Sequence, residues 1–210
     1  SYLGQNGLYF DAAWNVTSGI LLIVTIHNFL PALSPLIEWK TNTGIQTYVV
    51  ETDTLVPEID SAHAIKEIIH WYYQNRGVRY VMLFGDSEIL PTRYTLMGYE
   101  KDEFFDSDYL TRPSWGWDWC GGGAFDNRML TFLPNFFATD LYYADLYNGK
   151  SSFATWDSNE NGYFGEIYFN FPNGDNLDLI PDIAVGRVPV SNLEEAENYV
   201  YKVLEYEAKA

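Results

Sequence analysis

The sequence is poor in basic residues, and this scarcity limits the partners that the chain can bind. Its 12 Lys and Arg residues stand against 29 Asp and Glu residues, which gives a formal net charge of −17. Nucleic-acid binding needs Lys and Arg clusters against phosphates, so we expect no nucleic-acid partner. An anionic membrane surface is disfavoured for the same reason. The acidic composition instead suits cation binding and, with 18% aromatic residues, favours a secreted or cell-surface protein.

The sequence also has only one cysteine, Cys120, so an internal disulfide is impossible. A cysteine nucleophile requires a positioned histidine base. The three histidines all precede Cys120 and show no catalytic motif; they are His27, His63 and His70. We therefore assign no catalytic residue in this chain. Cys120 is interpreted as part of a Trp- and Gly-rich loop, with a nucleophilic role as the less favoured alternative.

Two further motifs are missing. The apolar run near the amino terminus, Ile20–Ile26, is far too short to span a bilayer. No G-x-G-x-x-G sequence follows any predicted strand, because Gly85 and Gly186 stand alone. A nucleotide-binding domain is therefore a less favoured alternative.

Four segments have the composition of strands: residues 20–26, 46–51, 80–84 and 181–189. Tyr80–Phe84 is a continuous apolar run without a polar face. Such a strand is typical of a parallel sheet that helices cover on both faces. These segments therefore predict the core of an α/β domain.

Helical periodicity connects the predicted strands. Apolar residues recur at helical spacing in residues 29–41 and 62–75. A final helix is predicted to begin after Ser191 as its N-cap, with Glu194 as the capping-box partner. Right-handed β-α-β crossovers then give an open, mainly parallel, Rossmann-like four-stranded sheet of order 2-1-3-4, with helices on both faces.

We predict a single α/β domain over residues 1–210. Residues 1–19 are expected to form an amino-terminal arm, and residues 20–91 the β-α-β-α-β core. Residues 92–138 are too long for a normal connection and predict a loop insertion. Residues 139–210 then carry a calcium-like loop, the fourth strand and the terminal helix.

The predicted functional edge of this sheet lies where Tyr80–Phe84 ends. Ligands of open parallel sheets gather at the carboxyl ends of the strands. Gly85 and Asp86 follow the strand and would lie at that edge. The alternative is that Gly85 only ends the strand and Asp86 only stabilises a turn.

The sequence from Asp157 resembles the beginning of a calcium-binding loop, D-x-N-x-N-G. Oxygen ligands at alternate positions of a tight turn converge on one point, and Gly162 permits the turn. The pattern differs from an EF-hand because its twelfth position is Tyr168 and not Glu. The predicted ligands are Asp157, Asn159, Asn161, Tyr163 (through its carbonyl) and Glu166. A structural calcium with weak affinity is the prediction, and an Asn- and Gly-rich turn without an ion is the alternative.

The order of motifs along the chain resembles the amino-terminal subdomain of the catalytic unit of the gingipain family of cysteine peptidases. The matching segments cover nearly the whole chain except the 92–138 insertion; they are Ile20–Ile26, Leu36–Lys40 with Gly44, Tyr80–Pro91, Thr139–Asp145, Pro181–Pro189 and Leu204–Glu207. The resemblance implies an exported peptidase that often binds calcium.

The resemblance also implies that this chain lacks the catalytic machinery. In that family a His-Gly motif and a later Cys belong to the next subdomain, and no His-Gly occurs here. The chain would therefore be a scaffold whose partner is the carboxyl-terminal catalytic subdomain of the same polypeptide. Protein or peptide substrates would bind through that subdomain. The alternative function is a calcium-stabilised extracellular binding or adhesion module.

Overall fold

The structure, a computed structural model, describes residues 2–3, 9–10, 19–53, 60–99, 135–149, 152–169, 175 and 177–209. Contacts divide the chain into two compact units: Ser1–Leu90 with Ile183–Ala210, and Pro91–Asp182. This grouping of contacts does not test whether the chain folds as one domain, so the single α/β domain over residues 1–210 stays a prediction. Cys120 lies outside the described residues. Within the predicted arm, β1 (Tyr2–Leu3) and β2 (Tyr9–Phe10) form an antiparallel pair.

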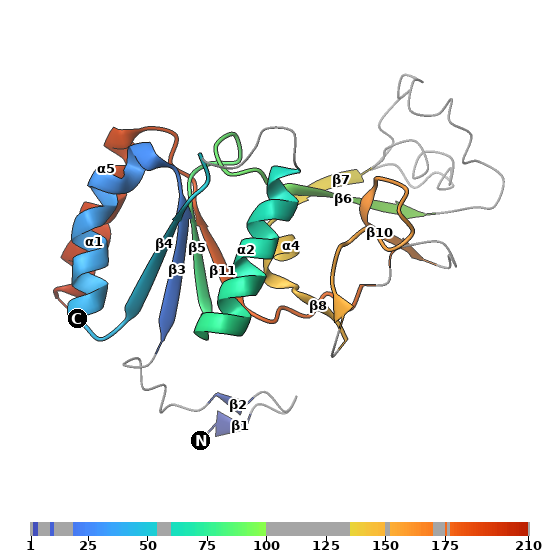
Figure 1. Cartoon of the computed structure of the whole chain (residues 1–210), viewed down its shortest axis with the longest axis horizontal. Coiled ribbons are helices and arrows are strands. Elements are labelled where there is room, and N and C mark those ends of the chain that lie inside the picture. The colour runs from blue at the N-terminus through green and yellow to red at the C-terminus, as the bar shows by residue number, and fades with distance from the viewer. Residues whose placement is uncertain are drawn as a thin grey trace, which may run out of the picture. The chain divides into compact units, whose positions relative to one another are not determined.

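The first unit contains a four-stranded parallel sheet. Its strands are β3 (Ile20–Thr25), β4 (Gln46–Glu51), β5 (Tyr80–Phe84) and β11 (Ala184–Val188). The spatial order is β11-β5-β3-β4, and every neighbouring pair is parallel (Figure 1). The predicted α/β class and strand order 2-1-3-4 are thus confirmed.

Helices cover both faces of this sheet (Figure 1). The helical elements are η2 (His27–Phe29), α1 (Leu30–Asn42), α2 (Ser61–Arg76) and α5 (Leu193–Glu207). Helices α1 and α5 share one buried cluster with alternate residues of β3, Leu21 and Ile23. The intervening residues Leu22 and Val24 are also buried, and they point to the opposite face, which α2 covers.

The helix caps explain where two of these helices begin. The Asp60 carboxylate accepts hydrogen bonds from the backbone N–H groups of Ala62 and His63, as expected of an N-cap. The prediction for α5 was wrong by one residue. Asn192, and not Ser191, is the N-cap of α5 and accepts a hydrogen bond from the Glu195 N–H at 3.0 Å.

The return bond of this cap starts one residue before the N-cap and so differs from a regular capping box. The Glu195 carboxylate, and not that of Glu194, accepts a hydrogen bond from the Ser191 N–H at 2.8 Å. Ser and Asn are both favourable N-cap residues and stand next to each other, so composition alone could not separate them.

The second unit contains strands that the sequence analysis did not predict. The elements are β6 (Arg93–Tyr99), β7 (Asn135–Thr139), α4 (Leu141–Ala144), β8 (Tyr147–Asn148), β9 (Ser152–Phe153) and β10 (Phe164–Phe169). Strand β6 pairs with β10 in parallel and with β7 in antiparallel orientation. The ends of the predicted insertion are therefore strands, and residues 100–134 lie outside the described part of the chain.

Large aromatic side chains form the buried centre of the second unit. Tyr142, Tyr143 and Trp156 are almost completely buried. The rings of Tyr142 and Trp156 meet edge to face at a centroid distance of 5.5 Å. The guanidinium of Arg93, from β6, stacks on the rings of Tyr142 from α4 and Phe164 from β10.

Candidate functional site

The carboxyl ends of β3 and β5 are directly connected. The buried Thr25 hydroxyl donates a hydrogen bond to the Phe84 carbonyl at 3.0 Å. The chain order reverses between these two strands, since β4 lies beside β3 on one side and β5 on the other. Such a reversal point is where ligands of open α/β sheets bind. The predicted functional edge of the sheet therefore lies here, at the residues that follow β3 and β5.

Gly85 is buried at this edge and has little space around it. A Cβ atom at this position would lie 3.1 Å from side-chain atoms of both Ile89 and Leu90. Its N–H donates to the Val188 carbonyl of β11 at 3.0 Å. The glycine thus allows the chain to turn sharply against its own loop while it stays hydrogen-bonded to the neighbouring strand.

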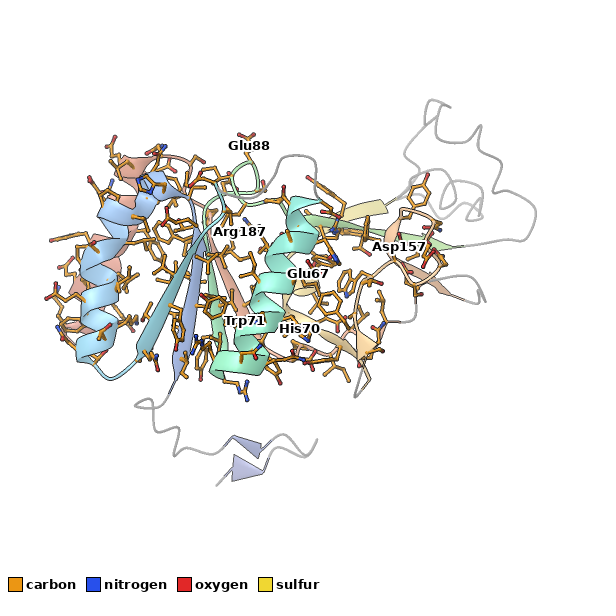
Figure 2. The ribbon with its side chains drawn as sticks, viewed as in Figure 1. Glu67, His70, Trp71, Glu88, Asp157 and Arg187 are labelled. Atoms are coloured by element: carbon orange, nitrogen blue, oxygen red, sulfur yellow. The ribbon has the colours of Figure 1, made fainter. Side chains whose placement is uncertain are left out.

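Asp86 stabilises the turn that Gly85 begins. Its carboxylate accepts a hydrogen bond from the Ser87 N–H at 2.7 Å, and its carbonyl accepts from the N–H groups of Ile89 and Leu90. Arg187 holds the same loop from β11, because its guanidinium donates to the carbonyls of Gly85 and Leu90 (Figure 2). These bonds support the structural interpretation of Gly85 and Asp86 that stood as the alternative.

Acidic side chains and a histidine lie at the ends of β3 and β4. His27 Nδ1 is 2.7 Å from a Glu51 carboxylate oxygen, and the His27 N–H donates to the Asp53 carboxylate. The His27 side chain is 75% exposed, so solvent weakens this ion pair. The group therefore connects the ends of two strands rather than forming a desolvated reactive centre.

The predicted calcium loop is closed at its base by Trp156 and Gly165. The Gly165 N–H donates to the Trp156 carbonyl at 2.6 Å, and the buried Trp156 indole donates to the Asp145 carboxylate at 2.7 Å. Gly165 has a positive φ of 67°, and a Cβ atom there would lie 2.6 Å from the Thr95 hydroxyl. Only glycine fits this position without displacing its neighbours.

Side-chain oxygens inside the loop bind its backbone. The Asp157 carboxylate accepts from the N–H groups of Asn161 and Gly162, and the Asn161 side-chain oxygen accepts from the Tyr163 N–H (Figure 2). The side-chain amides of Asn159 and Asn161 both donate to Glu166 Oε2, at 2.9 and 2.7 Å. The structure thus places the side chains of four predicted ligands in one hydrogen-bonded loop; they are Asp157, Asn159, Asn161 and Glu166. Among the described contacts of this loop, Tyr163 takes part through its backbone N–H and not through its carbonyl, which was the predicted ligand.

A second carboxylate, Asp175, joins Glu166 beneath the loop. Glu166 is only 3% exposed, and its N–H donates to Asp175 Oδ2 at 3.0 Å. The Ser158 N–H and hydroxyl donate to the other oxygen of Asp175. Burial raises the pKa of the Asp175 carboxyl and the negative charge of Glu166 adds to this, while the hydrogen bonds from Glu166 and Ser158 oppose it. The sequence pattern did not reveal Asp175, because it follows Glu166 outside the regular spacing.

The structure does not establish a metal site in this loop. Within the part of the chain that is described, no group of three or more His, Cys, Asp or Glu side chains could hold a metal ion. The Asn159 and Asn161 oxygens accept backbone N–H groups, and their amide nitrogens face Glu166. Calcium ligation by these residues therefore stays a prediction.

The described histidines do not form a catalytic pair. His27 contacts Glu51, and His63 lies 3.5 Å from Glu67 one turn further along α2. His70 lies on the same helix. A cysteine peptidase needs a histidine beside its thiol. Cys120 lies outside the described residues, so the prediction that this chain supplies no catalytic residue is not tested by these contacts.

The parallel sheet, its covering helices and the reversal point define an α/β fold that a known protease shares. A solved structure described as a protease matches with a TM-score of 0.52 at 20% sequence identity. The match covers 92% of this chain and 29% of that chain. At this identity the likeness shows the fold alone.

The sequence family is identified by a match to a family profile. The profile of Peptidase family C25 matches residues 16–210, so the chain belongs to this family, the gingipain family. The chain is therefore related to the cysteine peptidases, and the resemblance stated from its motifs is confirmed. No curated protein matches the chain. No helix in the described ranges is long and apolar enough to cross a membrane.

Proposed function

We propose that this chain is the amino-terminal subdomain of an exported cysteine endopeptidase of family C25. It acts as a scaffold for a carboxyl-terminal catalytic subdomain of the same polypeptide, which supplies the histidine and the cysteine. Protein or peptide substrates reach this chain only through that partner. The observation that carries the proposal is the family match over residues 16–210 combined with the lack of any His-Gly motif in the sequence.

The geometry at the edge of the sheet supports a scaffold rather than a reactive centre. Asp86 and Arg187 form hydrogen bonds within the loop after β5, and the Thr25 hydroxyl connects β3 to β5. These contacts hold the carboxyl ends of the strands in fixed positions. A catalytic subdomain gains from a rigid neighbour because reacting groups must be held in a narrow range of geometry.

The test is peptide cleavage by two preparations, residues 1–210 alone and the longer polypeptide that includes the following subdomain. Both are tested with and without Cys120→Ala. We expect cleavage only by the longer polypeptide, with a rate that Cys120→Ala does not change. Cleavage by residues 1–210 that Cys120→Ala abolishes would show that the nucleophile lies in this chain and would overturn the proposal.

We also propose a weak structural calcium site at the loop of Asp157, Asn159, Asn161, Tyr163 and Glu166. The buried Glu166 carboxylate and its neighbour Asp175 support it, because a divalent cation beside them would offset their mutual repulsion. Oxygen-rich sites of this kind with few carboxylates bind calcium in the range of about 10⁻⁴–10⁻³ M. The chemistry that the ion supplies is loop stabilisation and not catalysis.

The calcium proposal is tested by thermal unfolding in calcium and in chelator. A ligand of the native state raises the melting temperature by mass action, so millimolar calcium should stabilise the protein and a chelator should reverse the effect. The calcium-dependent shift should disappear in Asp157→Ala, whereas Asp178→Ala, outside the loop, should retain it. Equal melting temperatures with calcium and with chelator in the unmodified protein would exclude the site.

A further inference from the structure

The crossover connections of the first unit share one handedness. The chain passes from β3 through α1 to β4 on one side of β3, and then through α2 to β5 on the other side. Helices α1 and α2 lie on opposite faces of the sheet (Figure 1). A change of direction together with a change of face keeps both crossovers right-handed, as about 98% of such crossovers are.

Helix α5 determines where a further parallel strand can be added. It follows β11 and packs on the same face as α1, because both helices contribute to one buried cluster. A right-handed crossover over that face must move in the direction from β3 to β4. All positions between β11 and β4 are already occupied. Among the described strands, the next position in this direction is therefore the outer edge of β4, and not the outer edge of β11.

The end of α5 is held where such a strand would have to begin. The Glu207 carboxylate accepts from the Trp39 indole at 2.7 Å and from Lys40 Nζ at 2.5 Å. Trp39 and Lys40 form the end of α1, which leads through Gly44 into the start of β4. A parallel neighbour of β4 must start at this same end. Figure 1 shows the carboxyl terminus beside the connection from α1 to β4.

The two edges of the sheet differ in their ability to accept another strand. The Thr52 N–H donates to the Thr25 carbonyl, so alternation directs the N–H groups of Thr47 and Val49 away from β3. In the described part of the chain, β4 pairs only with β3, and its sequence contains no Pro, Gly or Lys. Edge strands normally carry such residues as a protection against pairing.

The β11 edge carries this protection. The Ala184 N–H donates to the carbonyl of Arg79, the residue before β5. By the same alternation, the backbone nitrogen of residue 189 faces away from β5. That position is Pro189, which has no N–H and is exposed. Gly186 also lies within β11, and its Cβ position is open. The composition therefore favours pairing at β4 and disfavours it at β11.

We infer that the outer edge of β4 is the docking edge for the catalytic subdomain, and that the polypeptide following α5 adds a parallel strand there. The inference rests on the proposed function, since it assigns the place where the proposed partner attaches. Main-chain hydrogen bonds to Thr47 and Val49 would carry this pairing.

Amide hydrogen exchange tests the inference without a substitution. Exchange is compared between residues 1–210 and the longer polypeptide with the catalytic subdomain. The amides of Thr47 and Val49 should slow by about tenfold or more in the longer polypeptide, because pairing removes them from solvent. The outward amides of β11, Val185 and Arg187, should not slow. Equal exchange at Thr47 and Val49, or slowing at β11 instead, would overturn the inference.

A matched pair of proline variants provides the second test. Thr47→Pro and Val185→Pro each remove an outward N–H from one edge and leave the bonds to β3 or β5 in place. Residues 1–210 should keep the same circular dichroism spectrum with either change. In the longer polypeptide, limited proteolysis should release the catalytic subdomain faster with Thr47→Pro than with Val185→Pro. Equal rates would contradict docking at β4.

The two proposals fail separately in these experiments. If the longer polypeptide cleaves peptides but the β4 amides exchange freely, the proposed function stands and the docking edge is wrong. If the β4 amides are protected but the longer polypeptide does not cleave, the docking edge stands and the peptidase assignment is wrong.

Discussion

The two units of this chain are stabilised in different ways. In Ser1–Leu90 with Ile183–Ala210, the buried residues are mainly aliphatic and alternate between the two faces of a parallel sheet. In Pro91–Asp182, the buried aromatic rings make single hydrogen bonds to polar partners, such as that of Trp156 to the Asp145 carboxylate and that of Tyr143 to the Pro91 carbonyl. One unit is thus built from a repeated apolar pattern, whereas the other is joined by single polar contacts, some of them between residues as distant in sequence as Tyr143 and Pro91.

The largest expected effect tests the aromatic centre of the second unit. Trp156→Ala removes a completely buried side chain and should lower the free energy of unfolding by about 3–5 kcal/mol. Urea unfolding followed by circular dichroism measures this loss. A decrease below about 1 kcal/mol would mean that the ring contacts with Tyr142 do not stabilise this unit.

A smaller effect is expected from the carboxylate that binds the indole. Asp145→Ala leaves the buried Trp156 N–H without this acceptor and should cost about 1–3 kcal/mol. Asp145→Asn keeps an oxygen acceptor and serves as the control. Asp145→Asn should restore most of the lost stability. If both variants unfold at the same urea concentration as the original protein, the bond between Trp156 and Asp145 does not stabilise this unit.

The cap of α5 gives a test in the first unit. Asn192→Ala removes the side-chain acceptor for the Glu195 N–H and should cost about 1 kcal/mol. Ser191→Ala keeps the Ser191 N–H that binds Glu195, so its effect should stay within about 0.5 kcal/mol. Thermal unfolding of both variants decides between the observed cap and the one that the sequence favoured; a larger loss for Ser191→Ala would restore the latter.

The smallest expected effect concerns the pH dependence of stability at Asp175. Burial raises the pKa of this carboxyl in the folded state above its unfolded value of 3.8. Its protonated form is therefore favoured by folding, and its stabilising contribution is present below the unfolded pKa and lost as pH rises through the folded pKa. The original protein should gain stability relative to Asp175→Asn as the pH is lowered through this range. A constant difference in melting temperature across that range would contradict the raised pKa.

The sequence was sufficient for the first unit because its signals are periodic. Continuous apolar runs located β3 and β5, the β-prone residues 47–50 located β4, and the rule of right-handed crossovers ordered the strands correctly. The cap of α5 was missed by one residue because Ser191 and Asn192 are both suitable. Gly85 and Asp86 do follow β5 as predicted, but a functional role for them stays a prediction, and their structural role became clear only from the bonds of Arg187.

The second unit could not be read from local patterns. Thr95 contacts Gly165 across 70 positions, and no spacing rule connects these two residues. Regular spacing revealed the loop of Asp157, Asn159 and Asn161, but Asp175 reaches it through a return of the chain. Strands β6 and β10 were missed because their partners are distant in sequence.

The central claim is that this chain positions a cysteine nucleophile which it does not itself contain. Labelling with a thiol-reactive, peptide-based inhibitor tests this most directly, with the labelled residue identified by mass spectrometry in the active longer polypeptide. We predict that the label is found on a cysteine carboxyl-terminal to α5 and that Cys120 stays unlabelled. A label on Cys120 that appears together with loss of peptide cleavage would contradict it.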